Sequence, residues 1–130
     1  MKSIPALIAV AAAVSVTGLA SAQPPDREAE LAEILEGWTQ SGPPERCIQV
    51  RRARILRIVN QTAVVYRLGG TLYVNRPRGG VQYLDRRDAL VNRRGSTLLC
   101  DGEMMESADP YSSVVRLITS GPFVPYRRDD

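Results

Sequence analysis

The chain contains two cysteines, Cys47 and Cys100, and nearly all of its strand-like sequence lies between them. Short segments rich in Val, Ile, Leu and Tyr alternate there with turn residues, a pattern typical of antiparallel β-structure. A bond between the two cysteines would close a long loop and restrict the unfolded chain. These features together predict one small β-domain held by a disulfide.

The first 22 residues have the organisation of a secretory signal peptide. Lys2 gives a basic start, residues 4–19 are largely apolar, and Ala20-Ser21-Ala22 has the small-x-small form of a cleavage site. The alternative is a transmembrane anchor, which needs about 20 consecutive apolar residues, and this run is shorter. We expect cleavage after Ala22, no integral membrane segment afterwards, and a periplasmic or extracellular location.

In an oxidising compartment Cys47 and Cys100 are expected to form a structural disulfide. A redox-active pair is the alternative, but there is no Cys-x-x-Cys spacing, and no His or Lys follows the leader to lower a thiol pKa. Closing this loop should stabilise the fold by about 4 kcal/mol on the chain-entropy model.

Residues 23–44 are predicted to form a helix and a Pro-rich linker ahead of a β-domain at residues 45–126. Asp26 can cap a helix from about Arg27 to Thr39, whose apolar stripe comprises Leu31, Ile34, Leu35 and Trp38. We predict that this stripe packs on the β-domain. Docking on a membrane surface is the alternative, and the acidic polar face disfavours it.

The β-domain is predicted to contain eight short strands separated by turn signals. They are Cys47 to Val50, Ile55 to Val59, Ala63 to Leu68, Thr71 to Asn75, Val81 to Leu84, Ser96 to Cys100, Met104 to Met105 and Val114 to Ile118. We therefore expect a mainly β fold, a small antiparallel barrel or sandwich with one N-terminal amphipathic helix and one disulfide.

Gly69-Gly70 fixes a register, because two glycines tolerate the positive φ values of a two-residue hairpin turn. Tyr66 should then lie opposite Tyr73, and Val65 opposite Val74. Both faces of this hairpin are largely apolar, so it should be central in the sheet. The paired tyrosines could line a ligand groove, but we predict ordinary cross-strand packing.

The composition excludes several chemistries. The chain has no histidine, and Lys2 is its only lysine among 17 basic residues. Ser-His-Asp and Cys-His triads and imidazole zinc sites are therefore excluded, and so are lysine nucleophiles in the cleaved chain. We expect no enzymatic activity, no metal and no cofactor. Arginines are interspersed with acids, which argues against a nucleic-acid partner.

Carboxylates could still hydrolyse glycosidic bonds if two of them had separated pKa values. The candidates are Asp85 with Asp88, and Asp101 with Glu103 and Glu106. A calcium site in the second set lacks the EF-hand spacing. Because these acids sit beside turns and arginines, we interpret them as surface residues and keep a carboxylate-dependent hydrolase as an alternative.

Arginines are the predicted ligand-binding residues, and the candidates are Arg51, Arg52, Arg54, Arg57, Arg76 and Arg78. On a regular extended strand, Arg52 and Arg54 would point to one side, and Arg51 and Arg57 to the other. They could bind an anionic envelope component; otherwise they form surface ion pairs and cover apolar edges with their stems.

Five short motifs carry a resemblance to a family of small exported bacterial proteins that share a domain of unknown function. They are Arg46-Cys47-Ile48, the segment Ile55 to Val59, Tyr73-Val74-Asn75-Arg76, Leu99-Cys100-Asp101-Gly102 and Gly121-Pro122-Phe123-Val124-Pro125. The resemblance spans about residues 45 to 126. It implies two further cysteines at the positions of Val81 and Val115, which this chain lacks, and it carries over no catalytic residues.

These observations lead to a hypothesis of a non-enzymatic exported protein that binds an unknown envelope component or protein. A periplasmic protein inhibitor of an envelope enzyme is the alternative, which an exposed apolar or arginine-bearing loop near Arg76 to Gly80 would favour. The ending Gly121 to Tyr126, which contains the only phenylalanine, Phe123, is a further candidate surface.

Overall fold

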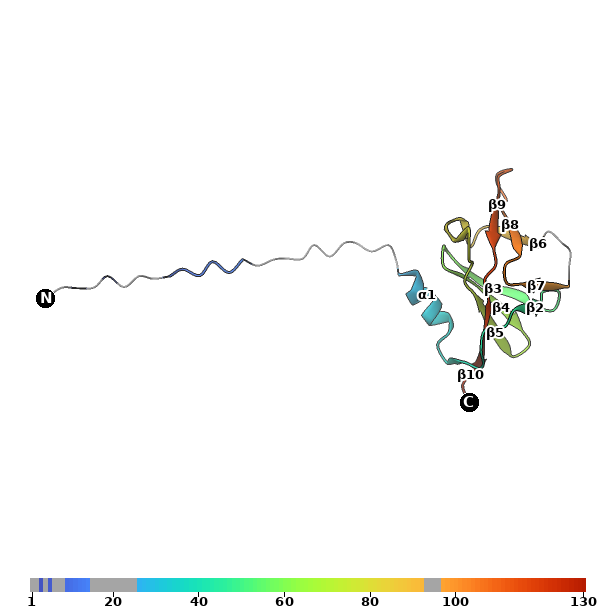
Figure 1. Ribbon diagram of the computed structural model, residues 1–130, viewed down its shortest axis with the longest axis horizontal. Helices are drawn as coiled ribbons and strands as arrows, with labels where there is room; N and C mark the ends of the chain where they lie inside the picture. Colours follow the sequence, from blue (N-terminus) through green and yellow to red (C-terminus); the bar gives the residue numbers. More distant parts are fainter. Residues whose placement is uncertain (1–2, 4, 6–8, 15–25, 93–96) are drawn as a thin grey trace.

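The structure is a computed structural model that describes residues 3, 5, 9–14, 26–92 and 97–130. The predicted cleavage site at Ala20-Ser21-Ala22, most of the predicted leader, and Ser96 lie outside these residues. Residues 26–130 form a mainly β fold with one α-helix and antiparallel sheets that do not close into a barrel (Figure 1). In the described part of the chain no helix is both long and apolar enough to cross a membrane.

Three antiparallel sheets are described, and the largest has the strand order β1-β10-β5-β4-β3. Its strands are β1 (Trp38–Gln40), β10 (Phe123–Arg128), β5 (Thr71–Asn75), β4 (Ala63–Leu68) and β3 (Arg54–Val59). A two-stranded sheet pairs β2 (Cys47–Gln49) with β7 (Leu98–Cys100), and a three-stranded sheet has the order β6 (Ala89–Asn92), β8 (Met104–Ala108), β9 (Val115–Thr119). A short 3-10 helix, η1, spans Val81–Tyr83.

The large sheet is the middle of three layers, because apolar side chains are buried on both of its faces. On one face Leu31 of helix α1 (Arg27–Ile34) packs on Val65, Leu72 and Val74. On the other face the core joins strands β3, β4 and β10 to the two smaller sheets, through Ile48, Ile58, Val64, Tyr66, Leu84, Leu99, Met105, Ile118 and Phe123. The predicted packing of the helix on the β-domain is thus confirmed.

The central hairpin β4–β5 has the predicted register, with Tyr66 opposite Tyr73 and Val65 opposite Val74. Gly69 supplies the positive φ, +59°, that its two-residue turn requires. Tyr66 is buried, and its ring packs edge-on against Phe123 with the centroids 5.9 Å apart. The tyrosine pair is therefore sheet packing, and Phe123 belongs to the core rather than to an accessible surface.

The predicted helix is too long at its C-terminal end. Asp26 caps the helix as expected by accepting a hydrogen bond from the Glu28 N–H at 3.1 Å, but the helix ends at Ile34. Gly37 has a φ of +80°, which turns the chain, and Trp38 begins β1. The apolar stripe still packs on the sheet, with Trp38 contributing from a strand.

Three strand assignments also need correction. Val81 to Leu84 is a 3-10 turn rather than a strand, because Gly80 enters it with a φ of +74°. Strands β6 and β10 were not predicted.

Strand β10 lies inside the large sheet despite Pro125, whose carbonyl oxygen accepts a hydrogen bond from the Ser41 N–H at 3.0 Å. In an antiparallel strand the N–H and C=O of one residue point to the same side. The ring nitrogen of Pro125, which has no N–H, therefore faces the end of β1, where no strand hydrogen bond is lost.

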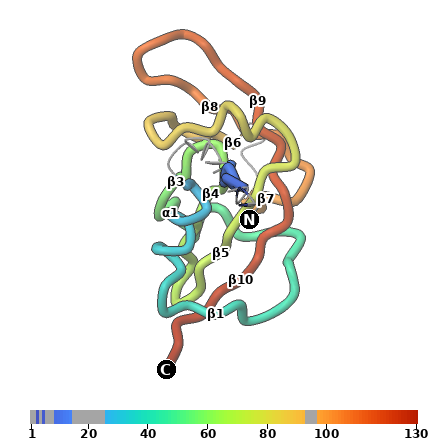
Figure 2. The backbone as a smooth tube through the Cα atoms, turned by 90° about the vertical axis from the view of Figure 1, so that its left-hand side faces the viewer, coloured from blue at the N-terminus to red at the C-terminus, as the bar shows by residue number. Residues whose placement is uncertain are grey.

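The connection between β8 and β9 extends away from the sheets, at the opposite end of the molecule from the C-terminus (Figure 2). Its Tyr111 is 94% exposed. Two local hydrogen bonds shape this loop: the Asp109 carboxylate accepts from the Tyr111 N–H at 2.8 Å, and the Ser112 hydroxyl accepts from the Val114 N–H at 3.1 Å. The loop thus presents an aromatic ring on an ordered turn.

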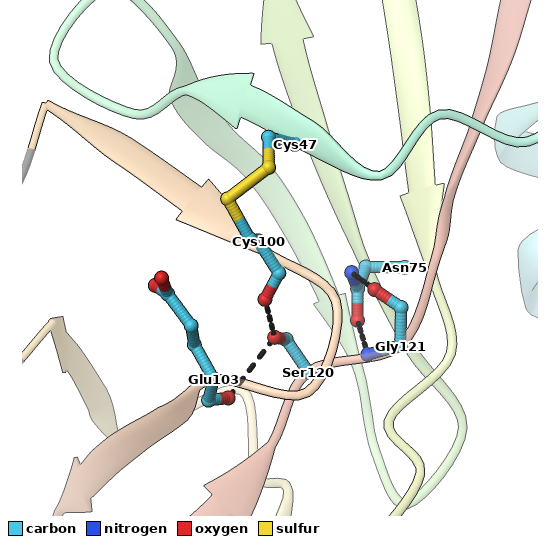
Figure 3. Close-up of a disulfide and its surroundings, with 6 residues drawn as sticks. All are labelled: Cys47, Asn75, Cys100, Glu103, Ser120 and Gly121. Carbon is cyan, nitrogen blue, oxygen red and sulfur yellow. Dashed lines mark hydrogen bonds between the residues drawn. A yellow bond between two sulfur atoms is a disulfide. The ribbon is translucent and has the colours of Figure 1, made fainter.

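The predicted disulfide joins Cys47 to Cys100, which lie directly opposite each other in the β2–β7 pair (Figure 3). Nearby, two hydrogen bonds link the buried Asn75 side chain to the backbone of Gly121: Nδ2 donates to the carbonyl oxygen at 2.7 Å, and Oδ1 accepts from the N–H at 3.0 Å. A Cβ at Gly121 would clash with the carbonyl oxygen of Arg76. The amide of Asn75 thus fixes the start of β10 by completing backbone hydrogen bonds.

Candidate functional site

A β-bulge in edge strand β3 brings two of the predicted arginines to the same face of the large sheet. Arg54 pairs with Arg67 and Arg57 pairs with Val65, and the register shifts between them because Leu56 is an extra residue. Since Arg67 and Val65 are two residues apart on β4, Arg54 and Arg57 share a face. The sequence-based expectation of opposite directions for Arg54 and Arg57 was therefore wrong.

Arg54 and Arg67 lie directly opposite each other on adjacent strands, and both are exposed. Like charges in this arrangement destabilise a sheet. Within the described residues neither side chain has an ion pair, and the same holds for Arg51 and Arg52 in the turn before β3. We call these four residues, together with Arg57, the arginine surface.

Arg57 forms the one ion pair of the arginine surface that the described residues show, with Glu30 of the helix at 3.4 Å. Both side chains are partly exposed, so this pair contributes little to stability. Leu56, the bulged residue, is also exposed. Arg67 donates a hydrogen bond from Nε to the carbonyl oxygen of Gly69 at 3.3 Å. The surface therefore combines four guanidinium groups that have no carboxylate partner with an exposed apolar side chain at a sheet edge.

The other two predicted ligand-binding arginines are held in ion pairs instead. Arg76 binds Glu28 with two hydrogen bonds of 2.7 and 2.9 Å, and Arg78 binds Asp101 with two of 2.5 and 2.7 Å. Hydrogen bonding to Arg76 lowers the pKa of Glu28, and hydrogen bonding to Arg78 lowers the pKa of Asp101. The Arg76–Glu28 pair therefore links helix α1 to the segment after β5, and the Arg78–Asp101 pair links the β7–β8 turn to the same segment.

The segment Arg76 to Gly80 is correspondingly fixed to its surroundings. Besides the two ion pairs, Gly79 and Thr119 form a β-bridge, and the Arg78 N–H donates to the carbonyl oxygen of Thr119 at 2.9 Å. Arg76 and Arg78 are both exposed, with 53% and 59% of their side-chain surfaces accessible, but both are held in ion pairs. The β8–β9 connection projects further from the sheets (Figure 2).

A cleft of about 380 Å³ lies between the start of α1, the β3–β4 turn, the segment after η1 and the β8–β9 loop. Its charged lining residues are three arginines and three aspartates: Arg27, Arg87, Arg116, Asp85, Asp88 and Asp109. Amides, hydroxyls and tyrosines complete its polar lining: Asn60, Gln61, Gln82, Ser107, Ser112, Tyr83 and Tyr111. Sequence reasoning found two of the aspartates but not the cleft, because the four segments are far apart along the chain.

The candidate carboxylates divide between this cleft and other surfaces. Asp85 and Asp88 line the cleft, whereas Asp101, Glu103 and Glu106 do not. A side-chain hydrogen bond from Arg87 lowers the pKa of Asp85, which is the opposite of what a general acid needs. In the part of the chain that the structure describes, no three acidic or cysteine side chains are close enough to hold a metal ion.

Hydrogen bonds within the cleft hold its polar groups in place. The Asp85 carboxylate accepts from the N–H of Arg87 at 2.8 Å and from its guanidinium at 3.2 and 3.3 Å. The Ser107 hydroxyl donates to Asp88 at 2.9 Å. The guanidinium of Arg116 lies 4.7 Å from the centre of the Tyr83 ring, a cation–π distance.

Gln61 stands out in the wall of this cleft, because its φ of +54° is the one positive value at a non-glycine among the described residues. Its N–H donates to the carbonyl oxygen of Leu84 at 2.8 Å, and its side-chain oxygen accepts a hydrogen bond from Arg27. Residues held in such sparsely populated conformations cluster at binding sites. The strain therefore marks the cleft as a second candidate site.

Comparison of the chain with protein-family models, with curated proteins and with solved structures gives no match. The two candidate sites are therefore interpreted from their own geometry.

Proposed function

We propose that this is a non-enzymatic protein, exported by a signal peptide at residues 1–22, that binds an anionic component of the cell envelope through the arginine surface. The observation that carries the proposal is the direct opposition of Arg54 and Arg67 without a carboxylate between them. A guanidinium group binds carboxylate or phosphate through paired hydrogen bonds. An anionic ligand across the two strands would turn a destabilising pair into a binding site.

Three further observations support this proposal. The Cys47–Cys100 disulfide suits an oxidising compartment such as the periplasm or the extracellular space. The chain has no histidine, and the pKa values of Asp85 and Asp101 are lowered by their arginine partners, so these carboxyls are ionised bases rather than proton donors at neutral pH. The acidic residues of helix α1 lie beside the arginine surface, which favours a flexible soluble polyanion over a flat anionic membrane.

The proposal is tested by fluorescence anisotropy with labelled polyglutamate as the probe. Neutralising both arginines, in Arg54→Gln with Arg67→Gln, should weaken binding at least about tenfold, because two guanidinium contacts are lost. The control pair Arg86→Gln with Arg127→Gln removes the same charge from exposed arginines elsewhere. Equal losses in both pairs would show only a net-charge effect and would contradict the proposal.

A stability measurement separates binding from folding at the same residues. Because opposed like charges destabilise the β3–β4 pair, Arg67→Gln should leave the free energy of unfolding unchanged or raise it by about 0.2–1 kcal/mol. If Arg67→Gln is at least as stable as the wild type but binds polyglutamate less tightly, the loss of binding cannot come from unfolding. The arginine then has a role in binding. Vesicles of phosphatidylglycerol serve as a second probe, and preferential binding to them over polyglutamate would contradict the assignment to a soluble polyanion.

A further inference from the structure

The cleft described above differs from the arginine surface in that its lining carries equal numbers of basic and acidic residues. Asp85 is bound by Arg87, and Asp88 by the hydroxyl of Ser107, which is 1% exposed. Arg116 lies over the ring of Tyr83. With three basic and three acidic residues among the lining, the formal charges of the cleft cancel, so its net charge favours neither a cation nor an anion.

The groups that remain available are hydrogen-bonding edges and aromatic surface. A carboxylate accepts hydrogen bonds through about four lone-pair sites, and a guanidinium donates through five N–H groups. Each group can therefore still bond a ligand while it keeps its hydrogen bond within the protein. Carboxylate, amide and guanidinium edges can each pair with two neighbouring hydroxyls of one ligand. The exposed ring of Tyr111 provides an apolar plane beside them.

Such a lining fits an uncharged molecule that has many hydroxyls on its edges and C–H groups on its faces, which is the chemistry of a sugar ring. The volume of the cleft, about 380 Å³, falls in the range of small-ligand sites, about 300–1,000 Å³. The Asp85 and Asp88 carboxylates are held by hydrogen bonds before any ligand arrives, which reduces the cost of ordering them on binding. We propose that this cleft binds a neutral saccharide of one or two rings.

The position of Gln61 supports this assignment independently of the lining chemistry. Glycine would adopt its φ of +54° without strain, yet the chain has a glutamine whose side chain bonds Arg27 at the cleft wall. Gln61→Gly should therefore raise thermal stability while it weakens saccharide binding. If Gln61 only shaped the β3–β4 turn, Gln61→Gly would raise thermal stability and leave saccharide binding unchanged.

The test uses isotope-labelled protein recovered after export from cells that express residues 1–130, titrated with cellobiose or maltose in an NMR experiment. At about 10 mM sugar, well above a millimolar dissociation constant, amide shifts should change in the β3–β4 turn, in residues 82–88 and in the β8–β9 loop. Tyr111→Ala should weaken binding about tenfold, as expected for loss of one stacking contact. Its near-complete exposure means that the substitution leaves the fold intact.

The matched control is Met104→Ala, which removes an exposed apolar side chain outside the cleft and should leave sugar binding unchanged. The proposal is overturned if neither sugar shifts these amides, or if Tyr111→Ala and Met104→Ala bind alike. It is also overturned if glycine, inorganic phosphate or calcium chloride saturates the cleft while the sugars do not. Because the cleft and the arginine surface share no residue, either proposal can fail while the other stands.

Discussion

The hydrogen bonds between Asn75 and Gly121 make a strong prediction, because both partners are buried in the folded protein. Truncation in Asn75→Ala leaves the N–H and the carbonyl oxygen of Gly121 without their side-chain partners. Each buried polar group left unsatisfied costs about 1–3 kcal/mol. We therefore expect a loss of about 4 kcal/mol, a large fraction of the 5–15 kcal/mol typical of small domains.

The measurement is urea unfolding with the disulfide intact, in which the midpoint should fall while the slope stays unchanged. Asn60→Ala is the matched control, since the Asn60 side chain accepts one hydrogen bond from the Arg86 N–H, at 2.8 Å, in an exposed setting. Its loss should cost about 1 kcal/mol. If Asn75→Ala cost no more than this control, the structural role assigned to the Asn75 amide would be refuted.

Replacement by the isosteric acid adds a dependence on pH. In Asn75→Asp the protonated carboxyl can still donate to the Gly121 carbonyl oxygen, whereas the ionised form cannot and is buried as a charge. Burial raises the folded-state pKa above the unfolded value of about 3.9. The stability of this variant should therefore be greatest below about pH 4 and should fall as the pH rises through the folded pKa.

Three further predictions concern the disulfide, the glycine and an ion pair. Replacing both cysteines, in Cys47→Ser with Cys100→Ser, should lower the unfolding free energy by about 4 kcal/mol in urea, since 53 residues separate the bridged positions; a loss below about 1 kcal/mol would contradict the chain-entropy model here. Gly121→Ala should cost more than about 3 kcal/mol in thermal unfolding, because its Cβ meets backbone that cannot move aside; an unchanged midpoint would show that β10 shifts freely. Arg78 lowers the pKa of Asp101, so their pair contributes stability above about pH 4 that is lost as the pH falls through the folded pKa. Carboxyl titration by NMR should show that pKa rising in Arg78→Gln, and an identical titration in both proteins would disprove the coupling.

Local signals account for the parts of the fold that could be predicted from the sequence. The β4–β5 hairpin needed only a Gly-Gly turn between two apolar runs, and its register followed from residue counting. The cap at Asp26 likewise depends on residues next to it. Gly37 is also a local stop signal, and it ends the helix well before the Pro-rich linker at which the prediction placed the end.

Features that depend on distant segments could not be obtained in this way. Proline is disfavoured inside a sheet because it has no N–H, and only the position of β1 explains why Pro125 is tolerated in β10. The bulge at Leu56 reverses the alternation that a regular strand imposes, so the shared face of Arg54 and Arg57 was predicted wrongly. Asp85 and Asp88 were candidates, yet the opposite walls of their cleft, which include Arg27, Tyr111 and Arg116, come from distant parts of the chain.

The pairing of β1 with β10 constrains the order in which this molecule can be completed. Trp38 is aligned with Arg128, and the described pairing of β1 is with β10. A chain synthesised from its N-terminus therefore carries β1 and the β10-facing edge of β5 without their partner until Phe123–Arg128 has been made. Such distant pairing slows folding. Any truncation before Phe123 would remove the link between the first strand and the central hairpin, even with the disulfide intact.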